Sequence, residues 1–297
     1  MDTNDEKAYF HIRDGGSGYY VQKRGLIAVW GKEAVQFLDG LITNDMKTLE
    51  DGQQMLAAFP NAQGRLLAVV RVIRDGDRFL FETEEATREK VFQNLFRFTF
   101  AGDFFVEDLS DEFQCFDVFQ SEPPTIASGL IFAGNTHWAS FVPNDDVAKF
   151  EQETVDSGAI LVSEALYEIL RIESGIPKFG VDMDETTIVP ELGIEEMISY
   201  KKGCYIGQEI IARIHFRGHV AKRLTGLTLS ADIEQNSELL TKDGKNAGRV
   251  TSVTYSPKLK RFIALAYVRY DYLSEGTELL AGGEAAVDAV VTKLPFV

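Results

Sequence analysis

The chain has 297 residues, of which 46 are acidic and 30 basic, so its net charge is −16. Its length and its hydrophobic fraction of 45% predict a folded protein of two or three domains and exclude a disordered chain. The acidic balance argues against a broad nucleic-acid surface, because phosphate binding needs a positive field. It leaves room for a small anionic ligand at a local basic patch.

The cysteines, the N-terminal segment and the hydropathy of the chain indicate the cellular compartment in which we expect the protein. The two cysteines, Cys115 and Cys204, cannot form a disulfide framework, which predicts a reducing, cytoplasmic compartment. The acidic segment 1–7 lacks the basic and apolar regions of a secretory signal. No apolar run is long enough to span a membrane, so we expect no membrane partner.

Strands and helices alternate irregularly over the first two thirds of the chain. Apolar periodicity predicts, in chain order, a strand at 26–30, a helix at 32–42, strands at 54–59, 65–74 and 78–83, a helix around 91–98, strands at 104–106, 115–119, 130–133 and 138–142, and helices at 145–156 and 164–174. Ser163 is the expected N-cap of the last helix. Because there is no strict βαβ repetition, we expect an α+β fold.

The helical signal disappears after about residue 220. A short helix is expected to begin near Gln208 and to end at Gly218. Short strands separated by turns follow at 224–229, 237–240, 248–255, 262–268, 278–280 and 287–293. Evenly spaced short strands of this kind predict a small barrel or sandwich.

The window 201–223 stands out electrostatically. It holds six basic residues and one acidic one, a net charge of +5 that leaves −21 for the rest of the chain. Within it, Cys204 follows Lys201 and Lys202 at the apparent start of a helix, and both features favour the thiolate. A free cysteine is most often a small buried hydrophobe, but this electropositive setting favours a functional thiol.

Two other types of site use the same window. His215 and His219 are four residues apart, but Gly218 is expected to end the helix between them and no fourth ligand is evident, so we predict no metal site. A Cys–His nucleophilic pair lacks a marked oxyanion hole and an orienting third residue.

A second segment with candidate chemistry contains Arg171 and Glu173. Leu166, Ile169 and Leu170 lie along one helical face, which turns Glu173 inward. A buried carboxylate needs a cation or N–H donors, and residues two apart on a helix do not face each other. This argues against a simple Arg171–Glu173 surface pair. The more specific alternative is a carboxylate that accepts hydrogen bonds from the amino and N–H groups of a ring, such as a pterin.

The segment 202–209, Lys-Gly-Cys-Tyr-Ile-Gly-Gln-Glu, resembles the signature of the YgfZ-type proteins. These are paralogues of the glycine-cleavage T-protein, an aminomethyltransferase. Other segments resemble the superfamily in the same order: Phe37–Asp45 with its Thr-Asn-Asp turn, Arg171–Pro177, and Gly248–Val268. The eight-residue motif is specific, and the ordered set runs nearly from end to end.

The resemblance implies an α+β, three-domain ring with two interlocked subdomains and a small C-terminal β-barrel. It would place a folate-binding core at 1–218, split near 45–110, and the barrel at 219–297. It also implies that tetrahydrofolate, or a one-carbon derivative, binds in a central channel. The implied role is synthesis or repair of iron–sulfur clusters in client enzymes, including tRNA-modifying ones.

The resemblance also suggests roles for particular residues. Cys204 would be the functional thiol, with Lys202 beside it. Glu173 would sit where the superfamily's glutamate addresses the pterin. From their charge, and not from the motif, we expect Arg213, Arg217 or Lys202 to meet folate's carboxylates. The candidate folate-binding residues are Glu173, Arg171, Asn44, Tyr205, Arg213 and Arg217.

One departure separates this chain from the aminomethyltransferases. Those enzymes carry an acidic pair in the strand after an Asn-x-x-Gly turn. Here the turn Asn61–Gly64 is present, but Ala68 and Val69 occupy the positions of the pair. Neither can position or activate the folate amine, which disfavours classical aminomethyl transfer. A one-carbon transferase with another acid or base, and a binding module that has lost its ligand, remain the competing hypotheses.

Overall fold

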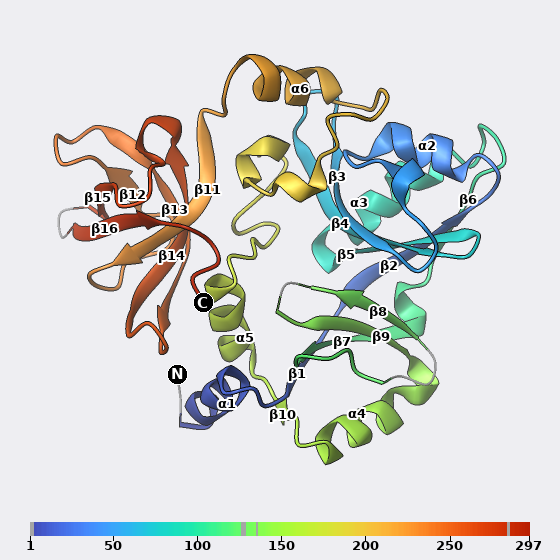
Figure 1. Ribbon diagram of the computed structural model, residues 1–297, viewed down its shortest axis with the longest axis horizontal. Coiled ribbons are helices and arrows are strands. Elements are labelled where there is room, and N and C mark those ends of the chain that lie inside the picture. Colours follow the sequence, from blue (N-terminus) through green and yellow to red (C-terminus); the bar gives the residue numbers. More distant parts are fainter. Residues whose placement is uncertain (1–2, 126–128, 135, 284–285) are drawn as a thin grey trace. The chain divides into compact units, whose positions relative to one another are not determined.

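The computed structural model describes residues 3–125, 129–134, 136–283 and 286–297 (Figure 1). The chain forms two compact units and passes between them several times. The first unit contains residues 1–60, 67–167 and 196–206, and the second contains 61–66, 168–195 and 207–297.

The first unit is built on two five-stranded sheets. One sheet has the order β10-β1-β7-β9-β8, with strands Ile160–Leu161, Gly18–Gln22, Phe113–Phe119, Trp138–Pro143 and Leu130–Ala133. The other has the order β3-β4-β5-β2-β6, with strands Gln54–Pro60, Leu66–Asp75, Arg78–Glu84, Arg24–Trp30 and Phe105–Asp108. β1 pairs with β10 in parallel and with β7 antiparallel.

Strand β2 is apolar on both faces because both faces are buried. Leu26 and Ala28 pack in a cluster that joins the two sheets, whereas Ile27 and Val29 pack in a cluster that includes helices α2 and α3. The helices of the chain are α1 (Thr3–Arg13), α2 (Ala34–Leu41), α3 (Glu85–Phe96), α4 (Val147–Asp156), α5 (Glu164–Glu173) and α6 (Gln208–Arg217).

The second unit contains a closed barrel. Its strands follow the order β11-β14-β13-β12-β15-β16, with bounds Lys222–Leu229, Arg261–Arg269, Asn246–Ser256, Glu238–Leu240, Glu278–Ala281 and Val287–Thr292. Closure leaves no unpaired edge, and alanines alternate with larger aliphatic residues in its core.

The predicted α+β fold with a C-terminal barrel is confirmed. Ser163 does cap α5, since its hydroxyl accepts the N–H of Leu166 at 3.1 Å. Helix α1 and strand β1 were not predicted, because α1 buries only Ala8 and Tyr9 and shows little apolar periodicity. The helix expected from residue 145 begins at Val147 as an α-helix, after a 3₁₀ turn.

A charged triad lies inside the first unit. Glu82 of β5 is 1% exposed and binds Arg24 of β2 and Arg71 of β4, with 2.7 Å between Arg71 Nε and Glu82 Oε2. Burial alone would raise the pKa of Glu82, but the two guanidinium groups outweigh it and lower the pKa to about 2. The carboxylate therefore compensates two cations on neighbouring strands.

We predict that Glu82→Gln lowers the free energy of unfolding at neutral pH by about 3 kcal/mol, because it leaves two half-buried guanidinium groups without their buried anion. The stabilisation by ionised Glu82 is present above its ordinary pKa of 4.5 and is lost as pH falls towards about 2. Urea titrations at pH 7 and pH 3 should therefore show a smaller gap between wild type and variant at pH 3. Glu89→Gln, at an exposed position of α3, is the matched control. A gap that does not change with pH would contradict the assignment.

Candidate functional site

The ammonium of Lys202 is buried. Its side chain is 0% exposed, and Nζ donates to the carbonyl oxygens of Ile42 and Asn44 at 2.9 and 2.6 Å. It also pairs with Asp39 Oδ1 at 3.2 Å. Burial lowers the pKa of Lys202, and Asp39 opposes that shift. An ammonium has three hydrogens to donate, so these three partners satisfy it and hold the motif against the end of α2.

The Thr-Asn-Asp turn after α2 provides the other half of this anchor. Thr43 Oγ1 donates to the carbonyl of Met197 at 2.5 Å. Asn44 Nδ2 donates to the carbonyls of Leu56 and Glu196 at 2.8 and 2.9 Å. Both amide protons of Asn44 are therefore donated within the first unit. One bond joins the turn to β3, and the other joins it to the segment that precedes the motif.

Tyr205 and Ile206 fasten the far end of the motif. The Tyr205 ring lies 5.1 Å from Lys202 Nζ and is 8% exposed, and burial raises its pKa to about 12. The Ile206 N–H donates to the carbonyl of Gly40 at 3.0 Å, and its side chain packs on the core of α2. The motif is thus anchored on both sides of Cys204.

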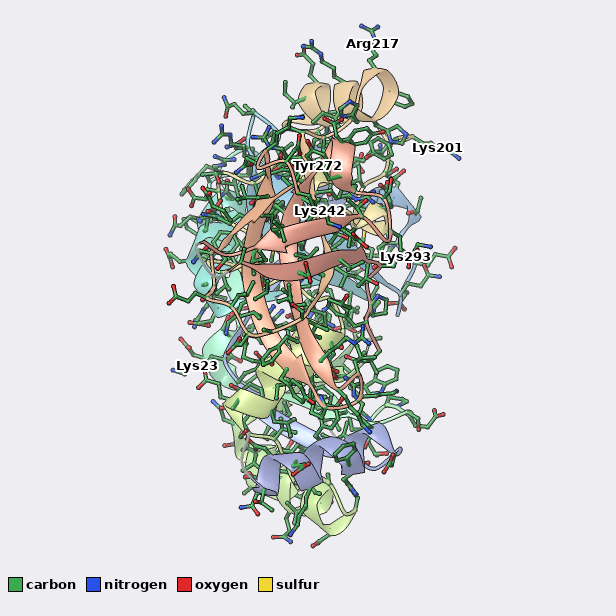
Figure 2. All side chains as sticks on the ribbon, turned by 90° about the vertical axis from the view of Figure 1, so that its left-hand side faces the viewer. Lys23, Lys201, Arg217, Lys242, Tyr272 and Lys293 are labelled. Carbon is green, nitrogen blue, oxygen red and sulfur yellow. The ribbon has the colours of Figure 1, made fainter. Side chains whose placement is uncertain are left out.

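The two cysteines have opposite settings. Cys204 is exposed, between the buried side chains of Lys202 and Tyr205. Cys115 of β7 is buried, and burial raises the pKa of its thiol well above the usual range. Since Lys202 directs its ammonium to Asp39 and the two carbonyls, Lys201 is the cationic neighbour that lies exposed with Cys204. Figure 2 shows Lys201 extending away from the fold.

Gly207 joins the motif to α6. It has a φ of +79°, and a Cβ there would come within 2.4 Å of the Asn61 carbonyl oxygen. Only glycine suits that position, because the Asn61–Gly64 turn packs directly against it. Helix α6 ends at Gly218, as predicted, with Arg213 and Arg217 on its exposed surface.

Arg171 and Glu173 lie in the second unit and make separate contacts. Arg171 donates to Asp182 Oδ2 at 2.8 Å and to Ser252 Oγ at 3.0 Å, and pairs with Glu168 at 2.8 Å. Glu173 is 0% exposed, as expected for its inward face, and accepts a hydrogen bond from Ser256 of β13. The structure therefore groups Asn44, Lys202, Cys204 and Tyr205 in one unit, and Arg171 and Glu173 in the other.

Asp117 is a residue that the sequence analysis did not select. It is 1% exposed on β7, and its Oδ2 accepts from Tyr167 Oη at 2.7 Å and from Gln22. His137 Nε2 lies 3.5 Å from the same oxygen, and burial lowers the pKa of that imidazole. Oδ1 has no hydrogen-bond partner among the described residues. The signal in the sequence was a carboxylate within the apolar run 115–119.

Other features limit the chemistry. Ala68 is fully buried on β4, and neither it nor Val69 supplies an ionisable group. Among the described residues, no three His, Cys, Asp or Glu side chains are grouped so as to hold a metal ion. Within the same residues, no helix is long and apolar enough to cross a membrane.

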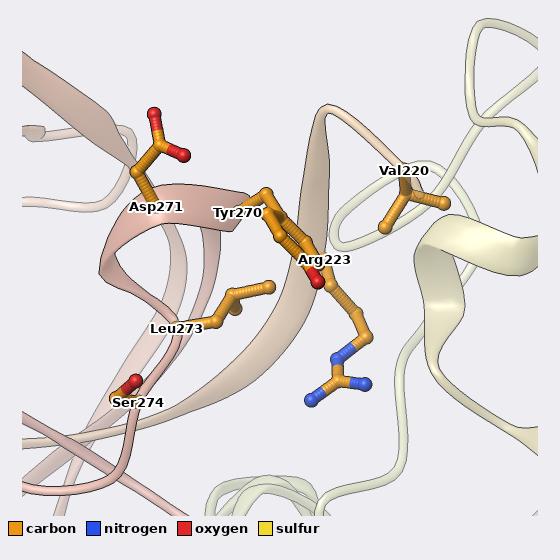
Figure 3. Close-up of a pocket in the computed structure, with 6 residues that line it drawn as sticks. All are labelled: Val220, Arg223, Tyr270, Asp271, Leu273 and Ser274. Atoms are coloured by element: carbon orange, nitrogen blue, oxygen red, sulfur yellow. The ribbon is translucent and has the colours of Figure 1, made fainter. Parts of the chain in front are cut away.

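A hollow of about 480 Å³ opens on the second unit (Figure 3). It is lined by Val220, Arg223, Tyr270, Asp271, Leu273 and Ser274. Val220 and Arg223 belong to the basic window 201–223, but none of the candidate thiol or folate-binding residues lines this hollow.

Two protein-family models match this chain, one in its N-terminal part and one in its C-terminal part. The family described as "GCVT N-terminal domain" matches residues 6–122, and the "Glycine cleavage T-protein C-terminal barrel domain" matches residues 222–297. The crystal structure of glycine cleavage system aminomethyltransferase T from Bartonella henselae superposes with a TM-score of 0.87. It covers 99% of this chain and 89% of that one at 21% identity, which shows a shared fold.

Curated relatives fall into two groups. The iron–sulfur cluster assembly factor IBA57 homolog of Mycosarcoma maydis is 30% identical over 70% of this chain, which spans only 56% of that relative's length. The tRNA-modifying protein YgfZ of Escherichia coli is 28% identical over 79% of each chain. An aminomethyltransferase of Thermosipho melanesiensis is 24% identical over 96% of this chain and 86% of its own. The chain carries both domains of the glycine-cleavage T-protein superfamily and belongs to it, and its relatives include proteins of the YgfZ and IBA57 type as well as aminomethyltransferases.

We predict that Lys202→Met lowers the free energy of unfolding by about 2 kcal/mol, because the carbonyls of Ile42 and Asn44 lose their donor. Asp39, 5% exposed, is then left with the exposed Lys47, at 3.0 Å, as its cation. Lys201→Met removes the same charge from an exposed position and should change stability by no more than about 0.5 kcal/mol. Denaturant unfolding of both variants measures the difference. Equal effects would contradict the anchoring role of Lys202.

Proposed function

We propose that this protein binds a folate and supports the synthesis or repair of iron–sulfur clusters in client enzymes, including enzymes that modify tRNA. The observation that carries the proposal is the exposure of Cys204 on a backbone anchored by Lys202 and Tyr205. A thiol held in this way is available to a partner protein, whereas Cys115 is not. The names of the IBA57 and YgfZ relatives support the choice of clients.

Cys204 would act as a thiolate, which is a soft ligand for iron and a nucleophile towards sulfur. One thiolate does not hold a cluster by itself, since clusters in proteins are held by several ligands. The described residues offer no group of three ligands. We therefore assign Cys204 a transient role, in which the client supplies the remaining ligands. A reducing cytoplasm would keep the thiol available.

The folate part of the proposal needs an acceptor for the N–H donors of the pterin ring. Glu173, the residue that the resemblance suggests, already accepts from Ser256. Asp117 has an oxygen without a partner among the described residues, buried beside Tyr167 and Gln22. A buried, unsatisfied carboxylate oxygen is costly, and a ligand that donates to it would remove the cost. Asp117 therefore has the chemistry of a pterin acceptor and is a second candidate for that role, in addition to the expected Glu173.

A second candidate function is folate-dependent aminomethyl or one-carbon transfer. It is supported by aminomethyltransferase relatives that match 96% of the chain. Ala68 and Val69 in place of the acidic pair argue against the usual chemistry. Formation of methylene-tetrahydrofolate from an amine donor by the purified protein would favour this function over the first.

For the cluster function, we predict that Cys204→Ala abolishes the support of client activity in cells that lack the endogenous protein. The measurement is the level of a tRNA modification installed by an iron–sulfur enzyme. Cys115→Ala is the matched control and should leave that level unchanged, because its thiol is buried. Full modification in the Cys204→Ala strain would overturn the central claim.

For the folate function, we predict that tetrahydrofolate binds the wild-type protein and that Asp117→Asn weakens binding about tenfold, since a hydrogen bond to a charged acceptor is lost. Titration calorimetry measures the affinities, with Glu173→Gln as the comparison. A larger loss with Glu173→Gln, at unchanged thermal stability, would assign the pterin to Glu173 instead. Absence of heat with the wild type would remove folate from the proposal.

A further inference from the structure

Helix α6 presents an exposed face of unusual composition. Arg213, Phe216 and Arg217 are spaced by three and four residues, which places them on the same side of the helix. All three are exposed, and Phe216 retains 67% of its accessible surface. Figure 2 shows Arg217 extending from the end of α6 into open space. We call these three residues the α6 face.

The charges of the α6 face are not used by the fold. Neither arginine forms a salt bridge within the described part of the chain. The less exposed Arg24, Arg71, Arg88 and Arg171 all do. The helix packs inward through Ile211, which is fully buried on the opposite side. Two guanidinium groups without a salt bridge in the described chain, together with an exposed phenyl ring that contacts His215, therefore form a positive, partly apolar surface on a chain of net charge −16.

We propose that the α6 face docks an acidic segment of the iron–sulfur client protein. This inference rests on the proposed cluster function, and it adds the surface and the chemistry by which a client is recognised. Single exposed apolar residues are common and need no explanation. Here the phenyl ring shares one side of α6 with two arginines, and aromatic residues and arginine are both enriched at the centres of protein interfaces.

The charge pattern favours an acidic protein over two other anions. The carboxylates of a folate would engage the guanidinium groups but would not need the phenyl ring to be exposed. A nucleic acid would meet an acidic surface outside this window, which lowers its affinity. An acidic protein segment with apolar side chains complements both components of the face.

The α6 face is also close to the thiol along the chain. Gln208, the first residue of α6, follows Cys204 by only four positions, so their Cα atoms lie within about 14 Å even if the chain is fully extended. A client seated on α6 is thereby brought near Cys204. Docking would raise the effective concentration of the client's cluster ligands at the thiol.

The test measures binding of a purified, cluster-free tRNA-modifying iron–sulfur enzyme by biolayer interferometry. We expect the double variant Arg213→Glu/Arg217→Glu to bind at least about tenfold more weakly, and Phe216→Ala about fivefold more weakly. The matched control reverses two exposed arginines of the barrel, Arg249→Glu/Arg261→Glu, and should stay within about twofold of wild type. Added salt should weaken the wild type more than the double variant.

Several outcomes would overturn the inference. The inference fails if the wild type does not bind the client, or if the double α6 variant binds it as well as the wild type does. It fails if the barrel control loses as much binding as the α6 variant. It also fails if the α6 variant loses tetrahydrofolate or tRNA binding but keeps client binding. A change in oligomeric state without a change in client binding would instead assign the α6 face to self-association. Circular dichroism and thermal unfolding show whether the variants fold, and Arg213→Lys/Arg217→Lys should retain binding.

A cell assay separates this inference from the proposed function. If Cys204→Ala abolishes tRNA modification and the double α6 variant does not impair it, the function stands and the docking surface fails. If neither variant impairs it, the proposed function itself fails.

Discussion

The buried ammonium of Lys202 is the interaction on which the arrangement of the motif depends. Its contacts with Asp39 and with the carbonyls of Ile42 and Asn44 hold a loop that has no strand or helix of its own. Charged groups are rarely buried without partners, so this loop is fixed where the three acceptors are. Everything the motif presents, above all the exposed Cys204, follows from that constraint.

The motif combines a fixed backbone with one accessible reactive group. Lys202 and Tyr205 are buried and Gly207 is required by close contact with the Asn61–Gly64 turn, so these three motif positions serve structure. Cys204 alone among these four has its side chain outside. This division explains how one short segment can be both a structural joint and a site that meets another protein.

The relatives share this fold while differing in chemistry. A TM-score of 0.87 with an aminomethyltransferase at 21% identity shows that the backbone is retained when the residues change. In this chain Ala68 and Val69 of β4 supply no ionisable group, whereas buried carboxylates lie at Glu82 and Asp117. The shared backbone by itself therefore does not decide between transfer and cluster maintenance.

Local patterns in the sequence were sufficient to predict the fold class, the C-terminal barrel, the cap at Ser163 and the inward face of Glu173. These follow from local periodicity, turn chemistry and short patterns, which depend on residues close together in the chain. The functional role of Cys204 stays a prediction. The sequence did not determine that Lys202 turns inward to Asp39, that Glu82 binds two arginines, or that Asp117 keeps one oxygen without a partner in the described chain. Those contacts join residues far apart in sequence, and a charge pattern does not say which cation meets which carboxylate. The tertiary structure shows how the basic window is divided: Lys202 is buried and anchors the loop that carries the thiol, whereas Arg213 and Arg217 lie on the surface. The sequence could not show this, because burial and the choice of partner are properties of the packed chain.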